Sequence, residues 1–278
     1  MKLAELIALL AERGIHLSPS RGQNFLVDGN LLQAMVKELH LRPGEPILEV
    51  GPGAGVLTRF MLDAGCEVYA IEFDAKLADY LESEFAANPR FHLLKADACK
   101  ADIASFMQLP RDFRCISNLP YNISSVFLAQ CLELVSPPSE MFLLLQREMA
   151  DRLAADSSSK EYGSLTVRLG AAYDVKILRA VPPDVFFPRP NVQSAFIRLR
   201  RKSEIPSPEV MEVLSKVVRA AFSQRRKQMR KLVEPIFPAG VAAEVFNDLG
   251  ISTTARAEEL SIDTWLQVAG RLALRCRC

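Results

Sequence analysis

The sequence contains no apolar run that approaches the roughly 18 residues needed to cross a bilayer, so we expect no membrane partner. Its formal net charge is only +1, which excludes a chain that is basic throughout. Any nucleic-acid surface must therefore come from a local concentration of positive charge. The stretch from Met1 to Arg13 is amphipathic, carries two glutamates and lacks the small-residue cleavage site of a signal peptide. We expect a cytoplasmic protein.

Metal-ligating residues are few and scattered. The three histidines lie far apart in the sequence, and none of the six cysteines belongs to a Cys-x-x-Cys pair. Structural zinc sites need four such ligands at close spacing, so we predict no metal site. The cysteines are expected to be free thiols, as in most cytosolic proteins.

Buried strands and amphipathic helices alternate through the first half of the chain. This order predicts half of a doubly wound α/β sheet, whose ligands bind at the carboxyl edge of the strands. The predicted strands are 46–50, 67–71, 91–95 and 114–117, with helices at 56–62 and 75–85 between the first three.

Polar or flexible residues follow three of these strands. Gly51-Pro52-Gly53-Ala54-Gly55 is a turn that lets the backbone approach a ligand closely, and it is neither a P-loop nor Gly-x-Gly-x-x-Gly. Glu72 ends the second strand roughly 20 residues further on, where a carboxylate can accept both hydroxyls of a ribose. Asp97 follows the third strand, where it either accepts from an adenine amino group or caps the next segment.

The fourth strand delivers Asn118-Leu119-Pro120-Tyr121. Asn118 offers a side-chain carbonyl and Leu119 a backbone carbonyl, and Pro120 biases its neighbour toward an extended conformation. Tyr121 offers a face for a base. Two acceptors aimed at one exocyclic amino group would stabilise positive charge that develops during attack on a methyl group. The alternative is an ordinary strand-to-helix turn, in which Asn and Pro are common.

Four segments in the same order resemble the KsgA-type small-subunit rRNA adenine N6-dimethyltransferases. They are Gln23-Asn24-Phe25-Leu26, Glu49 to Gly55, Asn118 to Ser124, and Gln224-Arg225-Arg226-Lys227. The resemblance implies a mostly parallel seven-stranded sheet of the class I methyltransferase type, covering residues 1–202. It also implies a small all-α, rRNA-binding domain over residues 203–278.

The resemblance further implies S-adenosylmethionine as cofactor and two neighbouring adenines in the 3′-terminal hairpin loop of small-subunit rRNA as substrate, each methylated twice. We expect the protein to act as a monomer on an assembling small-subunit particle. The implied cofactor-binding residues are Asn24, Leu26, Gly51, Gly53, Glu72, Asp97 and Asn118. The implied catalytic residues are Asn118, Leu119, Pro120, Tyr121 and Phe186.

Two of these assignments have structural alternatives. In the resemblance Phe186 faces the target base opposite Tyr121, but Phe186 and Phe187 are equally compatible with core positions. A cluster of six basic residues without an acid lies between Arg219 and Lys231. Such a run is usually a solvated face, whereas here its local character favours contacts with RNA phosphates. We predict that Arg225, Arg226, Lys227, Arg230 and Lys231 bind RNA.

Three other functions were compared with small-subunit rRNA dimethylation. An Erm-type enzyme would carry out the same chemistry on large-subunit rRNA, and the Gln224 to Lys227 segment argues against it. A non-catalytic rRNA-binding assembly factor would not need the glycine turn, Glu72 and Asn118 intact. A NAD-dependent dehydrogenase is disfavoured by the form of the turn and by the Asn-Leu-Pro-Tyr segment.

Overall fold

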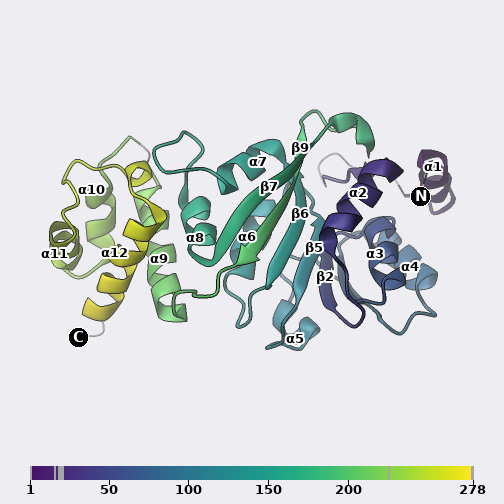
Figure 1. Cartoon of the computed structure of the whole chain (residues 1–278), viewed down its shortest axis with the longest axis horizontal. Coiled ribbons are helices and arrows are strands. Elements are labelled where there is room, and N and C mark those ends of the chain that lie inside the picture. The colour runs from purple at the N-terminus through teal and green to yellow at the C-terminus, as the bar shows by residue number, and fades with distance from the viewer. Residues whose placement is uncertain (1, 16, 18–21, 225, 277–278) are drawn as a thin grey trace. The chain divides into compact units, whose positions relative to one another are not determined.

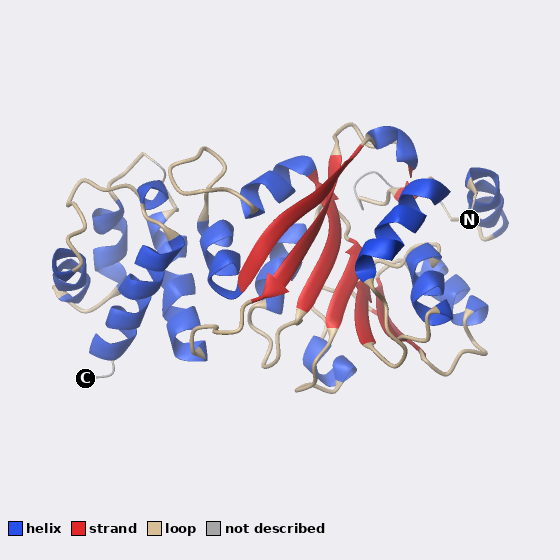
Figure 2. Cartoon of the chain, viewed as in Figure 1, coloured by secondary structure: helices blue, strands red, loops and turns tan. Residues whose placement is uncertain are grey.

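The computed structural model describes residues 2–15, 17, 22–224 and 226–276. Its centre is a seven-stranded sheet in the order β4-β3-β2-β5-β6-β9-β7 (Figures 1 and 2). The strands are β2 (Pro46–Val50), β3 (Glu67–Glu72), β4 (Phe91–Lys95), β5 (Arg114–Asn118), β6 (Glu140–Gln146), β7 (Tyr173–Val181) and β9 (Ser194–Arg201). A separate antiparallel pair joins β1 (Phe25–Leu26) to β8 (Phe186–Phe187).

The sheet is mostly parallel. β2 pairs in parallel with β3 on one side and with β5 on the other, and β3–β4 and β5–β6 are also parallel. β9 runs antiparallel to β6. The chain therefore reverses its direction of winding between β2 and β5, and ligands of such sheets bind at that point. The predicted fold class is confirmed.

The predicted helices of the first half begin and end within a few residues of the observed ones. The helices up to β9 are α1 (Leu3–Glu12), α2 (Gly29–Leu39), α3 (Val56–Asp63), α4 (Ala75–Glu84), α5 (Ile103–Met107), α6 (Ser124–Cys131), α7 (Arg147–Leu153) and α8 (Ser164–Ala172). Asp28 and Asp74 cap α2 and α4 by accepting from backbone N–H groups of the first turn. Within the described residues, no helix is long and apolar enough to span a membrane.

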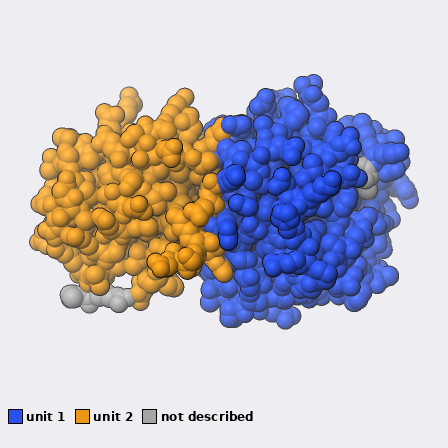
Figure 3. Space-filling model, viewed as in Figure 1, with its two compact units in different colours: residues 1–150, 176–200 blue, residues 151–175, 201–278 orange. Residues whose placement is uncertain are grey.

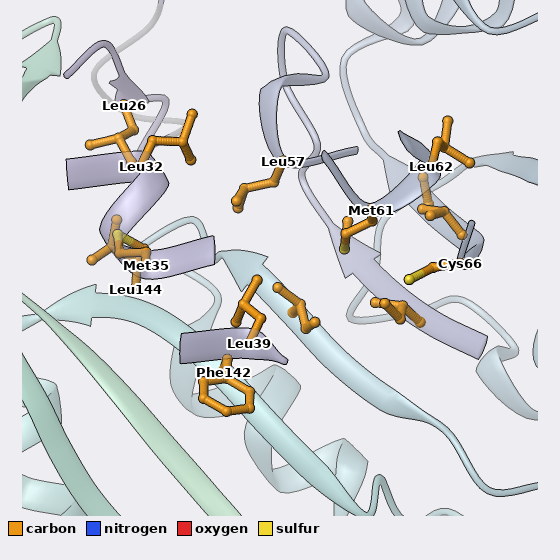
Figure 4. Packing of buried hydrophobic residues seen from close by; sticks show 14 of the residues in the cluster. Leu26, Leu32, Met35, Leu39, Leu57, Met61, Leu62, Cys66, Phe142 and Leu144 are labelled. Atoms are coloured by element: carbon orange, nitrogen blue, oxygen red, sulfur yellow. The ribbon is translucent and has the colours of Figure 1, made fainter. Parts of the chain in front are cut away.

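Both faces of the central strands β2, β5 and β6 are buried. On one face, Leu32, Met35 and Leu39 of α2 pack with strand residues such as Phe142 and Leu144 (Figure 4). The alternate strand residues, among them Leu48, Cys115 and Leu143, point to the opposite face and are also inaccessible. Burial on both faces explains why these strands are almost continuously apolar in sequence.

The chain divides into two compact units, coloured in Figure 3. One comprises Met1–Ala150 with Lys176–Arg200, and the other comprises Asp151–Val175 with Arg201–Cys278. The predicted division after residue 202 lies next to one observed boundary, but the grouping of 151–175 with the C-terminal helices was not predicted. Tyr162 shows why they do: its hydroxyl donates to the Leu260 carbonyl at 3.0 Å, and its ring packs edge-on against Phe222.

The second unit is held by its own helical core around the inaccessible Trp265. Besides α8, its α-helices are α9 (Pro208–Ala221), α10 (Met229–Val233), α11 (Val241–Asp248) and α12 (Ile262–Arg275), and Trp265 lies on α12. α10 is short: residues 226–228, which precede it, are not helical. A 3₁₀ turn containing Pro235, which has no N–H to donate, follows α10.

Candidate active site

The glycine turn after β2 lies between the two other motifs of the predicted site. Gly51 and Gly53 both have positive φ, at +65° and +60°. A Cβ at Gly51 would lie 3.0 Å from the ring of Pro120, and one at Gly53 would lie 2.8 Å from the ring of Phe25. Only glycine combines this backbone with such close neighbours. The turn thus packs directly against the segment that follows β5 and against β1.

These segments enclose a pocket of about 260 Å³ at the carboxyl edge of the sheet. The predicted site residues in its lining are Asn24, Leu26, Gly51, Gly53, Glu72, Asp97, Asn118 and Pro120. All seven residues predicted to hold the cofactor therefore share one cavity, although the sequence places them at five separate positions along the chain.

Glu72 is buried at the tip of β3, with 6% of its surface exposed. One carboxylate oxygen accepts from the Gly53 N–H at 3.1 Å, and the other accepts from the Asp74 N–H at 2.9 Å. Burial raises the pKa of Glu72, and these two backbone donors oppose the rise. The carboxylate therefore fixes the glycine turn while it lines the pocket.

Asp97 lies in the pocket lining and stabilises a turn rather than a helix. One carboxylate oxygen accepts from the Cys99 N–H at 3.0 Å and so stabilises the turn that follows β4. The residue also lines the pocket. It does not cap a helix, because α5 begins only at Ile103 and is capped by Asp102.

Asn118 ends β5 and lines the same pocket. Its Nδ2 donates to the backbone carbonyl of Asn24 at 2.7 Å. A carbonyl oxygen only accepts, so this contact identifies which branch of the amide carries the nitrogen. Oδ1 is then directed away from Asn24, and it has no hydrogen-bond partner among the described residues.

The rest of the segment, Leu119 to Tyr121, is held by contacts to Ser124 and to Ser194. Leu119 is inaccessible as a whole residue and lines neither pocket, so of the two predicted acceptors only Asn118 faces a cavity in this structure. Ser124 Oγ donates to the Pro120 and Tyr121 carbonyls at 3.2 Å, and it does not cap α6 through its side chain. The Tyr121 hydroxyl lies 2.5 Å from Ser194 Oγ, and burial raises the pKa of this tyrosine.

Tyr121 faces a second pocket of about 480 Å³, which shares lining residues with the first. Gly22, Gln23, Asn24 and Asn122 line both. The remainder of the second pocket is lined by Tyr121, Gln146 and residues 188–192. Two adjoining cavities that share amide-bearing residues such as Asn24 and Asn122 suit the transfer of a group between two bound molecules.

Comparison with known proteins decides the family. Residues 16–274 match the sequence profile described as "Ribosomal RNA adenine dimethylase". The chain belongs to this ribosomal RNA adenine dimethylase family. The resemblance inferred from the motifs is thereby confirmed, and the chain is an rRNA-modifying methyltransferase.

Curated relatives match this chain over nearly its whole length. A protein of Natranaerobius thermophilus named ribosomal RNA small subunit methyltransferase A is 34% identical, covering 95% of this chain and 94% of the relative. A protein of the same name from Thiobacillus denitrificans is 37% identical, covering 91% and 97%.

Two solved structures share the fold. The 23S rRNA methyltransferase ErmE has a TM-score of 0.64 and 26% identity, with coverage of 89% of this chain and 99% of that one. A dimethyladenosine transferase from Plasmodium falciparum has a TM-score of 0.73 at 20% identity, with coverage of 88% and 95%. Both place the chain among class I methyltransferases.

Phe186 does not lie opposite Tyr121 as predicted. Phe186 is only 3% exposed, belongs to the core cluster that contains Leu26, and lines neither pocket. The cause is its pairing with Leu26 across β1 and β8, which directs both side chains to the core. Its core alternative is therefore correct, and no aromatic ring from Phe186 lies opposite Tyr121.

Among the lining residues of the first pocket that were not predicted as site residues, Glu49 and Phe73 are the most relevant to its chemistry. Glu49 is 1% exposed, and burial raises its pKa to about 8 although Thr58 Oγ1 donates to it at 2.6 Å. Phe73, next to Glu72, is 65% exposed. An aromatic residue directly after the acidic residue at a strand end was the available signal for Phe73. For Glu49 the signal was an acid inside an otherwise apolar strand.

The predicted RNA-binding cluster is only partly available. Arg226, Lys227 and Lys231 are exposed. Arg230 donates to Glu234 at 2.6 Å and to Asn247 at 3.1 Å, so much of its charge is already offset. The prediction for Arg225 lies outside the described residues.

Proposed function

We propose that this protein transfers methyl groups from S-adenosylmethionine to N6 of two adjacent adenosines in the 3′-terminal hairpin loop of small-subunit rRNA, giving N6,N6-dimethyladenosines. The observation that carries the proposal is the orientation of Asn118. Its Nδ2 is held by the carbonyl of Asn24, a residue that lines both pockets, at 2.7 Å, which leaves Oδ1 as an acceptor in the first pocket.

The chemistry needs little acid–base catalysis. S-adenosylmethionine supplies a methyl group already activated by its positive sulfur, so positioning the attacking nitrogen in line is most of the task. The adenine amino group is a weak nucleophile because its lone pair is delocalised into the ring. In this proposal Asn118 Oδ1 accepts one of its hydrogens and stabilises the positive charge that develops during transfer. The second acceptor is the Leu119 carbonyl, which is inaccessible here and has to be uncovered when the base enters.

The residues of the first pocket fit the proposed cofactor. Glu72 presents a buried carboxylate to the ribose hydroxyls, and Asp97 accepts from the adenine amino group. Gly51 and Gly53 line the pocket, and their lack of side chains lets Pro120 and Phe25 pack against the turn that forms its wall. Asn24 and Leu26 close the pocket from β1, and the hydrogen bond from Asn118 ties this closing segment to β5.

The second pocket suits the target base. Tyr121 lines it and is anchored through its hydroxyl to the buried Ser194, so the ring is held in one orientation for stacking. A base reaches such a pocket only when it leaves its stack, and unpaired loop nucleotides do so at the lowest cost.

The helical unit provides the wider RNA contact in this proposal. Arg226, Lys227 and Lys231 are exposed on a chain that is otherwise close to neutral, which is the pattern expected for phosphate binding. We assign residues 203–278 to rRNA binding. The protein acts in the cytoplasm as a monomer, on rRNA within an assembling small-subunit particle.

The second candidate is Erm-type methylation of large-subunit rRNA, which the 26% identity to ErmE favours. The small-subunit function has the stronger support. The curated relatives named small subunit methyltransferase A are 34% and 37% identical over more than nine-tenths of this chain.

The test is incubation of the protein with methyl-labelled S-adenosylmethionine and small-subunit particles that lack the modification. We expect label on two neighbouring adenosines of the 3′-terminal hairpin, recovered as dimethyladenosine. Large-subunit particles from the same cells are the matched control. Label on large-subunit rRNA alone would favour the Erm-type function, and no label on either would contradict both.

A further inference from the structure

The two acceptors proposed at Asn118 and Leu119 recognise an amino group, but they do not identify the base that carries it. Guanine presents an oxygen where adenine has its amino group, and two acceptors repel that oxygen. Cytosine has an exocyclic amino group like that of adenine, and next to it an acceptor nitrogen on one side. A further contact is therefore needed to select adenine.

Strand register places one suitable side chain beside Asn118. In the parallel pair β5–β6, Asn118 lies opposite Leu144, so both side chains point to the same face of the sheet. Gln146 is two residues further along β6 and points to that face as well. Gln146 in turn lies opposite Ser194, which anchors Tyr121. Gln146 thus lies between the amide of Asn118 and the anchor of the stacking ring.

The Gln146 side chain is placed as a contact for a ligand. It is half-buried and lines the second pocket. Its amide has no hydrogen-bond partner among the residues that the structure describes. An amide in a pocket wall that is not committed to another described residue is available to hydrogen-bond a ligand that enters the pocket.

We propose that Gln146 selects adenine by donating a hydrogen bond from Nε2 to N7 of the target base. The proposal rests on the function proposed above. N7 is an acceptor beside the adenine amino group, and the equivalent position in cytosine is a C–H group that cannot accept. Donation to N7 therefore separates adenine from cytosine, and the acceptors at Asn118 and Leu119 exclude guanine.

The experiment uses small-subunit particles whose 3′-terminal hairpin carries adenosine, 7-deazaadenosine or cytidine at both target positions. 7-Deazaadenosine keeps the amino group but replaces N7 by a C–H group. Single-turnover methyl transfer is measured for the full-length wild type, Gln146→Leu and Gln146→Glu. Gln33→Leu is the matched control, because Gln33 is exposed on α2 and lines neither pocket.

We expect the wild type to methylate adenosine roughly three- to tenfold faster than 7-deazaadenosine, the effect of one hydrogen bond. Gln146→Leu should lose a similar factor on adenosine and show no further loss on 7-deazaadenosine. Gln146→Glu should also lose the preference, because a carboxylate cannot donate. The ratio of adenosine to cytidine methylation should fall in both variants, and Gln33→Leu should behave as the wild type.

Cofactor affinity, measured by calorimetry, should be unchanged in Gln146→Leu because Gln146 does not line the first pocket. This measurement separates loss of base selection from misfolding. If Gln146→Leu still prefers adenosine to 7-deazaadenosine as strongly as the wild type does, the inference is overturned while the proposed function stands. If the wild type transfers no methyl group to adenosine, both are overturned.

Discussion

Replacement of Asn118 by alanine tests the centre of the proposed mechanism. The side chain has one observed and one proposed role: Nδ2 donates to the Asn24 carbonyl at 2.7 Å, and Oδ1 is proposed to accept from the target amino group. Alanine removes both. Loss of one acceptor that stabilises charge in the transition state typically lowers turnover by about 100- to 1,000-fold. Loss of the hydrogen bond to Asn24 should lower the free energy of unfolding by only about 1 kcal/mol.

Asn118→Asp separates the two roles. The carboxylate keeps an acceptor toward the target, but it places an oxygen against the Asn24 carbonyl, which cannot donate. We therefore expect Asn118→Asp to bind cofactor more weakly than Asn118→Ala, because repulsion opens the segment that closes the first pocket. Asn118→Ala should bind cofactor nearly as well as the wild type does and fail mainly in transfer.

The assay is single-turnover transfer from saturating S-adenosylmethionine to small-subunit particles, with cofactor affinity and urea unfolding measured on the same samples. Ser125→Ala is the control, since Ser125 is exposed on α6 and lines neither pocket. Turnover of Asn118→Ala within about threefold of the wild type would refute the argument, because a single ordinary hydrogen bond accounts for that much.

Three further predictions concern the cofactor pocket and the basic cluster. Glu72→Ala should weaken S-adenosylmethionine binding about 10- to 100-fold by calorimetry through loss of charged hydrogen bonds, and wild-type affinity would remove Glu72 from the ribose site. Neutralising Arg226, Lys227 and Lys231 together should reduce the slope of rRNA affinity against salt by roughly two units, whereas an unchanged slope would make them ordinary surface. The buried Glu49, whose folded pKa is raised to about 8 from 4.5, stays protonated where the unfolded chain has lost the proton. The free energy of unfolding should therefore fall as pH rises from about 5 to 8, by on the order of 3 kcal/mol relative to Glu49→Gln in urea titrations, and equal pH dependence of the two proteins would contradict this.

Local sequence determined the elements of the nucleotide-binding half. β2 and β4 have the predicted ends, and α3 and α4 agree within one residue, because apolar periodicity is a local signal. β6 was not predicted. Its run Met141 to Leu145 is continuously apolar because both of its faces are buried, so no alternation marks it as a strand. Gln146 was consequently not considered as a site residue.

Sequence by itself determined the family, the glycine turn and the polar residues at the strand ends, because each of these is a property of a short segment with a fixed spacing. Only the tertiary structure decided which atoms of those residues face the pockets. Pairing of Phe186 with Leu26 buried a ring that was predicted to face the base, and the Asn24 carbonyl oriented the Asn118 amide. Such contacts join residues that lie far apart along the chain, and no local pattern specifies the partner.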